Sequence, residues 1–234
     1  MDVRFGHVEH SQAGILVSVN QHYFSEAPAG DFTPREIQVE LAGATRSVLT
    51  AGGVFSPEHL DQGTATLLAA LPDLTELDIV RAPADEAPVD GSAGAILDVG
   101  CGWGPIALAA ALDHRDREVW AIDVNERSRE LTRRNAERLG LTNVRVAAPE
   151  DVPADLAFAE IRSNPPIRVG KEVLHGILEQ WLPRLIPGGA AYLVVAKHLG
   201  ADSLQKWIAT SFDDLEVDRA ARKKGFHVLR AVRD

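Results

Sequence analysis

The stretch that decides the fold is Ala95-Ile96-Leu97-Asp98-Val99-Gly100-Cys101-Gly102-Trp103-Gly104-Pro105. Its first five residues are mostly apolar and predict a buried strand, and its proline predicts the first turn of a helix over residues 105–112. The glycines between them form a turn whose backbone can approach a ligand closely. In an open α/β sheet such a turn lies at the carboxyl end of a strand, where ligands bind. No Walker lysine follows the glycines, so a P-loop is disfavoured.

Strands and helices alternate from this turn to the end of the chain. The pattern predicts further strands over 119–122, 144–147, 156–162 and 190–196, and helices over 126–139, 171–182 and 202–210. Two final strands, over 215–219 and 226–232, are predicted to form an antiparallel pair at one edge. The alternation therefore predicts an α/β fold with a parallel sheet and helices on both faces.

The residues before position 95 follow a different plan. A short strand or buried segment is predicted at 15–19, a β-hairpin from strands at 37–41 and 47–50, and a helix over 60–71 that ends before Pro72. Residues 81–94 are rich in Pro, Ala and Asp and read as an acidic linker or loop. We expect an N-terminal extension over 1–80, this linker, and a core domain over 95–234.

Composition and charge restrict the class of protein. The chain has 234 residues, of which 45% are hydrophobic, so whole-chain disorder is excluded. No apolar run is long enough for a transmembrane helix, and the polar N-terminus is not a signal peptide, so we expect a cytoplasmic protein without membrane contact. The net charge is −10, and residues 1–90 carry all of it. This charge argues against broad, nonspecific nucleic-acid binding, although local basic clusters remain in the second half of the chain.

The number and spacing of the cysteine and histidine residues do not indicate a metal site. The single cysteine, Cys101, excludes an internal disulfide and a multi-cysteine metal centre, and we interpret it as a small packing residue of the glycine loop. The eight histidines include one close pair, His7 and His10, which lacks further spaced ligands. The sequence leaves the oligomeric state open, with a monomer slightly favoured.

Two carboxylates accompany the glycine loop. Asp98 precedes the first glycine by two positions, and Asp123 ends the next predicted strand. An ionised carboxylate offers two acceptor oxygens, which suits Asp123 to a pair of ribose hydroxyls. A carboxylate beside the loop disfavours pyrophosphate and suits a ligand with a cationic end, such as the amino group of a methionine moiety.

A second motif, Ser163-Asn164-Pro165-Pro166, ends the fourth predicted strand. The exocyclic amine of a base is a poor nucleophile because its lone pair is delocalised into the ring. The side-chain oxygen of Asn164 and the carbonyl of Pro165 can accept its N–H groups and direct the lone pair at an electrophilic methyl group. The contribution is positional and electrostatic, and two prolines stiffen the carbonyl.

Together these segments resemble class I S-adenosylmethionine-dependent methyltransferases with an (Asn/Asp)-Pro-Pro motif. The segments His22-Tyr23-Phe24-Ser25, Gly53-Val54-Phe55-Ser56, Leu60-Asp61-x-Gly63-Thr64 and Lys224-Gly225-Phe226 resemble the ribosomal small-subunit guanine-N2 methyltransferase family, in a short form with one catalytic domain. That resemblance implies a Rossmann-like seven-stranded sheet, S-adenosylmethionine as cofactor, and ribosomal RNA or the small ribosomal subunit as partner. It implies methyl transfer to guanine N2 of 16S ribosomal RNA.

The resemblance also implies roles for individual residues. Asn164 and Pro165 are the catalytic residues. The cofactor-binding residues are Gly53, Phe55, Asp61, Asp98, Gly100, Cys101, Gly102, Gly104, Asp123, Val124, Asp151, Val152 and Asn164. The substrate-binding residues are Pro166, Ile167, Arg168, Lys171 and Lys197, of which the three cations are candidate phosphate contacts.

The motif departs from the family at Ile167, where an aromatic residue usually stacks on the flipped base. Phe24, Phe55 or His198 can supply that surface instead. An Asn-Pro-Pro motif also suits adenine N6 or a glutamine side-chain amide as the methyl acceptor. A non-catalytic cofactor- or RNA-binding subunit is the alternative outside enzymes. A nicotinamide-dependent oxidoreductase would give the Asn-Pro-Pro turn no role.

Overall fold

The computed structural model describes residues 32–81 and 94–234. The predicted segment at 15–19, the histidine pair, Phe24 and residues 82–93 of the linker lie outside the described residues. The division into an extension, a linker and a core domain stays a prediction.

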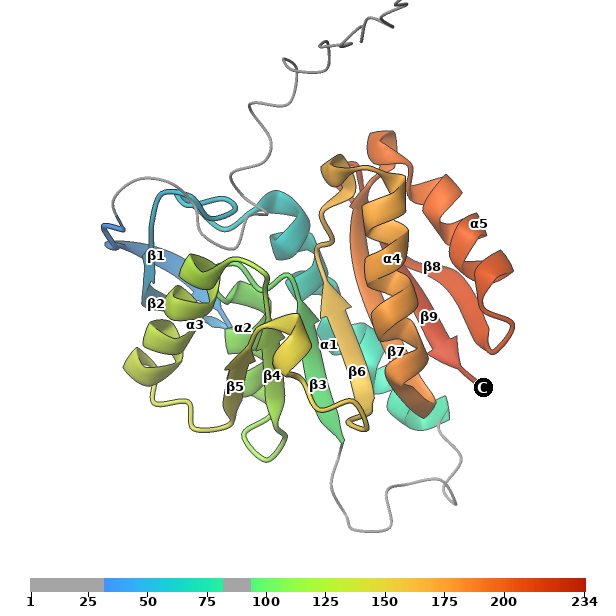
Figure 1. Cartoon of the computed structure of the whole chain (residues 1–234), viewed down its shortest axis with the longest axis horizontal. Helices are drawn as coiled ribbons and strands as arrows, with labels where there is room; N and C mark the ends of the chain where they lie inside the picture. The colour runs from blue at the N-terminus through green and yellow to red at the C-terminus, as the bar shows by residue number, and fades with distance from the viewer. Residues whose placement is uncertain (1–31, 82–93) are drawn as a thin grey trace, which may run out of the picture.

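A seven-stranded sheet forms the centre of the molecule, with strand order β5-β4-β3-β6-β7-β9-β8 (Figure 1). Its first five strands run parallel, and β9 runs antiparallel to both β7 and β8. The strands are β3 (Ala95–Val99), β4 (Val119–Ile122), β5 (Val144–Ala147), β6 (Phe158–Ser163), β7 (Leu185–Ala196), β8 (Leu215–Lys223) and β9 (Phe226–Arg233). The predicted mostly parallel sheet with an antiparallel edge pair is confirmed.

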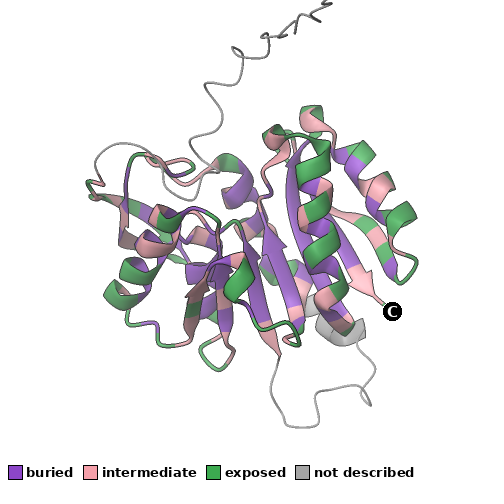
Figure 2. Ribbon diagram, in the orientation of Figure 1, coloured by how far each residue is buried: buried purple, intermediate pink, exposed green. Residues whose placement is uncertain are grey.

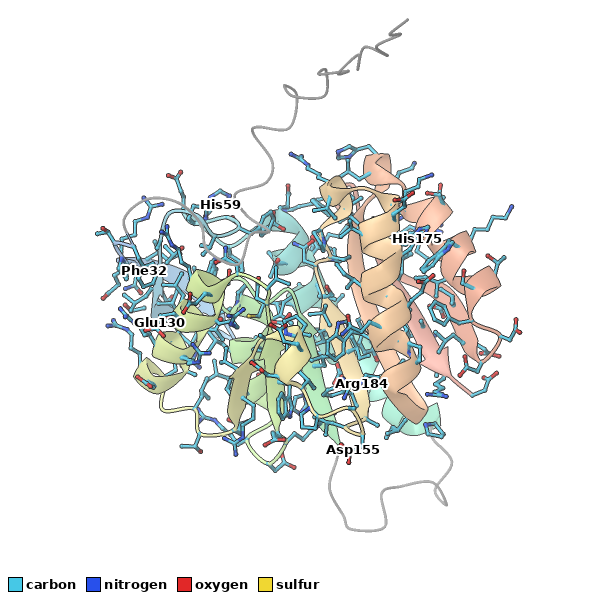
Figure 3. All side chains as sticks on the ribbon, in the orientation of Figure 1. Phe32, His59, Glu130, Asp155, His175 and Arg184 are labelled. Carbon is cyan, nitrogen blue, oxygen red and sulfur yellow. The ribbon has the colours of Figure 1, made fainter. Side chains whose placement is uncertain are left out.

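Helices cover both faces of this sheet. Two helices, α4 (Lys171–Trp181) and α5 (Ala201–Ser211), lie in front in Figure 1 and bury their apolar sides in one core cluster. On the other face, α1 (Gln62–Arg81), α2 (Pro105–Asp113) and α3 (Glu126–Arg138) contribute to two further clusters. Figure 2 shows the buried strands between helices whose outer sides are exposed. His175 extends from α4, and its ring stacks on that of Trp207 in α5 with centroids 3.7 Å apart (Figure 3).

The predicted β-hairpin is confirmed as β1 (Arg35–Leu41) and β2 (Ala44–Thr50). Its turn is Ala42-Gly43, and both residues have positive φ, 49° and 70°, as a type I′ turn requires. One side of the hairpin is buried against α2 and α3 in the same apolar cluster. The hairpin is therefore anchored to the helices on this face of the sheet.

The prediction that the first helix ends before Pro72 is wrong, because α1 continues to Arg81. A proline inside a helix removes one hydrogen bond and crowds the preceding turn. Pro72 lies on the exposed side, while Leu71 and Leu74 on either side of it are 4% and 6% exposed in a cluster with β7. Burial of apolar surface beyond the proline outweighs the local preference for a break.

Two strands of the central sheet, β7 and β8, extend by four or more residues beyond their predicted bounds. β7 begins at Leu185, which pairs with Phe158 before the ladder resumes at Ala190. The intervening Pro-Gly-Gly segment therefore belongs to an irregular part of the strand, where a Cβ on Gly189 would lie 2.9 Å from the Ile186 carbonyl oxygen. β8 continues to Lys223 past a register shift between Arg219 and Ala221. The predicted strand over 190–196 begins after the first irregularity, and the predicted strand over 215–219 ends at the second.

Candidate functional site

A narrow hollow forms where the carboxyl ends of β3 and β6 meet the loop between β2 and α1. Its volume is about 30 Å³. Six of the residues predicted for the site line it: Phe55, Asp61, Gly100, Cys101, Gly102 and Asn164. The structure thus brings together residues that are separated by as many as 109 positions in the sequence.

The glycine loop presents bare backbone to this side of the molecule. Gly100 and Gly102 have φ values of 78° and 59°, which L side chains rarely adopt, and a Cβ on either would meet no atom within 4 Å. Space for a ligand therefore lies directly over these two residues. Gly104 differs, because a Cβ there would lie 3.0 Å from Thr132 Oγ1. Its small size is required where the start of α2 packs against α3.

Asp98 is completely buried beneath the loop. Its Oδ2 accepts a hydrogen bond from the Ala107 amide at 3.0 Å, whereas its Oδ1 has no hydrogen-bond partner among the described residues. Burial raises the pKa of Asp98 to about 8, the charge of Asp123 acts in the same direction, and the bond from Ala107 and the charge of Arg162 oppose it. The carboxyl group is therefore mostly protonated near neutral pH.

Asp123 ties the end of β4 to the glycine loop. Its Oδ2 accepts from the Gly102 amide at 2.9 Å, and its Oδ1 accepts from the Asn125 amide at 2.8 Å. Burial raises its pKa, while those two bonds and a bond with Ser128 oppose the shift. Val124, which follows it, is 40% exposed and offers an apolar surface beside the carboxylate.

Asn164 is held by the first turn of α1. Its Nδ2 donates to Asp61 Oδ2 at 2.9 Å and to Thr64 Oγ1 at 3.0 Å. Among the described residues no donor is bonded to its Oδ1. The neighbouring Ser163 donates to the Val99 carbonyl oxygen at 2.7 Å and so connects β6 to β3. The Pro165 carbonyl accepts from the Ile167 amide at 2.8 Å, which leaves one lone pair for a second donor.

Several predicted site residues do not line the hollow. Asp151 is exposed in the short turn η2 (Pro149–Asp151) after β5, and Val152 is buried in the core cluster of the α4 face. Ile167, in the turn η3 (Ile167–Val169), is half-buried and packs against that same cluster. Arg168, in η3, is exposed, and so is Lys171, which begins α4. Lys197 is exposed at the start of η5 (Lys197–Leu199), directly after β7.

Sequence reasoning missed the side chains that fix the β2–α1 loop to the core. Asn125 Nδ2 donates to the Gly53 carbonyl at 2.9 Å, and Trp103 Nε1 donates to the Ser56 carbonyl at 3.2 Å. Asn135 bonds both backbone groups of Leu49 as well as the Trp103 carbonyl. The sequence did contain one indication of this role. Asn135 is a polar residue on the buried side of the amphipathic helix α3, which it shares with Leu131 and Thr132.

The described residues hold neither a candidate metal centre nor a helix that could span a membrane. Within residues 32–81 and 94–234 there is no group of three or more His, Cys, Asp or Glu side chains arranged to hold a metal ion. No helix described in the structure is long and apolar enough to span a membrane.

Comparisons with known proteins give one family model and several similar sequences. A family model described as methyltransferase small domain matches residues 45–230. The chain is 35% identical over 216 residues to the uncharacterized protein YbxB of Bacillus subtilis, an alignment that covers 91% of this chain and 98% of that protein. It is 32% identical over 200 residues to the ribosomal RNA small subunit methyltransferase C of Chromohalobacter salexigens, covering 83% of this chain and 53% of that protein.

A solved structure shares the fold. The T. thermophilus 16S rRNA N2 methyltransferase, in complex with AdoMet and guanosine, matches with a TM-score of 0.66 at 22% identity, covering 88% of this chain and 52% of that one. The chain therefore spans about half the length of both ribosomal RNA methyltransferases.

Proposed function

Because the chain belongs to the methyltransferase small domain family, we propose that it transfers a methyl group from S-adenosylmethionine to an exocyclic amine, guanine N2 of 16S ribosomal RNA. One observation carries the proposal. Asn164, of the Asn-Pro-Pro motif after β6, borders the same hollow as the glycine loop after β3. The proposed position of the target amine therefore adjoins the proposed position of the methyl donor.

The residues around the loop fit S-adenosylmethionine. The open space over Gly100 and Gly102 leaves room for its methionine part, and the buried, unpartnered Oδ1 of Asp98 suits the ammonium group. Asp123 suits the ribose hydroxyls, and exposed Val124 suits the adenine. The family resemblance adds Gly53, Phe55, Asp61, Cys101, Gly104, Asp151 and Val152 to the proposed cofactor set, and of these we assign Phe55 to the target base instead. The hollow, at about 30 Å³, is far smaller than S-adenosylmethionine, so most of the cofactor would lie outside it.

The chemistry divides between cofactor and chain. S-adenosylmethionine supplies a methyl group that its sulfonium already activates. Asn164 Oδ1 and the free lone pair of the Pro165 carbonyl accept N–H bonds from the target amine and hold its nitrogen in one orientation. The backbone bond from Ile167 to Pro165 keeps that carbonyl in place. The residues thus contribute positioning and electrostatic stabilisation, and the amine proton leaves to water.

Exposed cations around the carboxyl ends of the strands support an RNA substrate. Arg168 and Lys171 follow the Asn-Pro-Pro motif, and Lys197 follows β7. The Lys197 amide donates to the Gly225 carbonyl at 2.8 Å, so the β8–β9 turn, with exposed Arg222, Lys223 and Lys224, lies next to it. None of these cations pairs with a carboxylate of the described residues, which leaves them available to phosphates. In a chain of net charge −10, this local patch favours a structured RNA over general RNA binding.

Phe55 is the proposed stacking surface for the target base. Ile167 is partly engaged by the core, whereas the Phe55 side chain borders the hollow beside Asn164 and is 52% exposed. The Phe55 ring would stack on the target base there, a contact that the residue at the position of Ile167 usually makes in the family. Pro166 and Ile167 remain proposed contacts at the edge of the base.

The proposal is tested first by calorimetry and then by product analysis. We expect micromolar binding of S-adenosylmethionine and no comparable binding of a nicotinamide dinucleotide. Unmodified 16S ribosomal RNA and small subunits reconstituted on it are then incubated with labelled S-adenosylmethionine, and the products are digested and identified by mass spectrometry. N2-methylguanosine is the expected product. N6-methyladenosine or methylated glutamine would instead identify the other amines, and no methylated product would refute the proposed function.

Asn164→Ala separates catalysis from binding. The variant is expected to abolish transfer, with a rate loss at least on the order of 10²- to 10³-fold, because the acceptor that positions the amine is gone. Its affinity for S-adenosylmethionine is expected to survive. Gln180→Ala, an exposed position on α4, serves as the control and keeps full activity. Full activity of Asn164→Ala would refute the assigned mechanism.

A further inference from the structure

We propose that Asp61 and Thr64 are positioning residues that fix which end of the Asn164 side chain faces the target amine. The inference rests on the proposed function and changes the role of Asp61, which the family resemblance placed in the cofactor pocket. It also gives a role to Thr64.

The hydrogen bonds of the Asn164 amide set its orientation. A side-chain amide has two donors on nitrogen and two acceptor sites on oxygen. Both donors are directed at α1, where Asp61 Oδ2 lies 2.9 Å and Thr64 Oγ1 lies 3.0 Å from Nδ2. A carboxylate oxygen accepts and does not donate, so the reverse orientation, with Asn164 Oδ1 against Asp61 Oδ2, would place two acceptors in contact. The bond to Asp61 therefore selects one of the two amide orientations.

The start of α1 makes this arrangement rigid. Asp61 is the N-cap of the helix, since its carbonyl accepts from the Ala65 amide at 2.8 Å and its Oδ2 accepts from the Thr64 amide at 3.0 Å. A Cβ on Gly63 would lie 2.9 Å from Asp61 Oδ2 and 3.0 Å from the Phe226 ring. Thr64 is 3% exposed. The spacing Asp-x-Gly-Thr thus lets Asp61 Oδ2 cap the helix at the Thr64 amide and also accept a hydrogen bond from Asn164.

Two chemical consequences follow for the amine. With both donors of Asn164 engaged by α1, only its Oδ1 remains for the substrate, and it accepts an N–H bond. A bond from Nδ2 to a carboxylate also polarises the amide and makes Oδ1 a stronger acceptor. An amide in the reverse orientation would present N–H groups to the N–H groups of the amine. Asp61 thereby favours substrates that donate, as an exocyclic amine does.

The test compares substitutions at position 61 in two backgrounds. Asp61→Asn keeps an oxygen for the helix cap, where Asn is as good as Asp, but loses the charge and the preference for one amide orientation. We expect kcat for ribosomal RNA to fall on the order of 10-fold, and on the order of 100-fold for Asp61→Ala, which loses a hydrogen bond to a charged group. Thr64→Val is expected to lower kcat by a smaller factor. Asp73→Asn, the same change on an exposed part of α1, is the matched control.

The decisive comparison uses Asn164→Asp. This substitution puts a second carboxylate about as close to Asp61 as the amide nitrogen now lies, and two such groups cannot both ionise easily. Asp61→Asn should therefore raise kcat in the Asn164→Asp background, on the order of 10-fold, although it lowers kcat in the wild-type background. A loss of helix stability alone would lower kcat in both. Lower kcat in both backgrounds, or a large loss of S-adenosylmethionine affinity with unchanged kcat, would overturn the inference.

A second readout needs neither substrate nor cofactor. In ¹⁵N-labelled protein, the side-chain NH₂ signal of Asn164 is identified by its absence from Asn164→Asp. We expect slow solvent exchange of these protons in the wild type and faster exchange in Asp61→Ala, with no change in Asp73→Asn. Equal exchange in wild type and Asp61→Ala would contradict the inference. If the chain methylates no amine yet shows the expected exchange, the proposed function fails and the hydrogen-bond geometry stands.

Discussion

The free energy of unfolding of the Asp98→Asn variant should rise relative to that of the wild type as the pH rises. The carboxyl group has an ordinary pKa near 3.8, and burial raises it to about 8 in the folded state. Between these values the folded chain holds a proton that the unfolded chain has released. The contribution of Asp98 to stability is therefore fully present at low pH and is lost as the pH rises through the folded pKa. Asn carries no titratable proton, so the variant lacks this loss.

The magnitude follows from the two pKa values. Between pH 5 and pH 7 the wild type is expected to lose about 1.3 kcal/mol of unfolding free energy per pH unit through this group, or about 2.5 kcal/mol in all. Above pH 8 both states are ionised there, and the difference between variant and wild type levels off. Titrating groups without an interaction with Asp98 are shared by both proteins and cancel in the comparison. Asp123 is the exception, because its charge acts on Asp98.

Urea unfolding of wild type and Asp98→Asn at pH 5, 6, 7 and 8 measures this difference. A new amide beneath the loop adds an offset that does not depend on pH, so the slope and not the absolute value is compared. A difference that is flat over this range, or one in which the wild type gains on the variant with rising pH, would refute the raised pKa and with it the protonated state at neutrality.

Three further predictions concern the site and its support. Binding of S-adenosylmethionine at pH 7 should release up to one proton, because its ammonium group favours the ionised form of Asp98. Calorimetry in buffers of different ionisation enthalpy measures this release. Equal release in Asp98→Asn would contradict the contact between Asp98 and the ammonium group. Phe55→Ala should lower kcat/KM for ribosomal RNA on the order of 10- to 100-fold through lost stacking, whereas Phe55→Tyr retains it. Equal activity of the two variants would exclude Phe55 as the stacking surface. Asn135→Ala should lower the unfolding free energy by about 2–4 kcal/mol in urea titrations, since one buried and two partly buried backbone groups lose their partners. A loss under about 0.5 kcal/mol would show that water replaces them.

The sequence predicted the sheet well because its strands are short apolar runs between clear turn signals. Residues 95–99, 119–122 and 144–147 are strands with the predicted bounds. Where burial overrides a local signal, the prediction fails, as at Pro72. The Rossmann-like sheet, the glycine loop and the motif at Asn164 required only local patterns and a resemblance.

The support of the site was beyond the reach of local patterns. The bond from Asn164 to Asp61 crosses 103 positions, and the bond from Asn135 to Leu49 crosses 86. No periodicity connects residues at such distances. Asp61 was recognised as a motif residue, but its partner depends on how α1 lies across the carboxyl end of β6, which only the tertiary fold determines.

The polar bonds that fasten the β2–α1 loop also bear on how the chain becomes active while it folds. They close loops of 47 to 103 residues, from Trp103 to Ser56 and from Asn164 to Asp61. Closing loops of this size costs chain entropy that local contacts do not offset, so native contacts of high sequence separation form slowly. The residues that orient Asn164 leave the ribosome long before it does, yet they cannot act until β6 is in place. Under the proposed mechanism, Asn164 is therefore oriented only late in the folding of the chain.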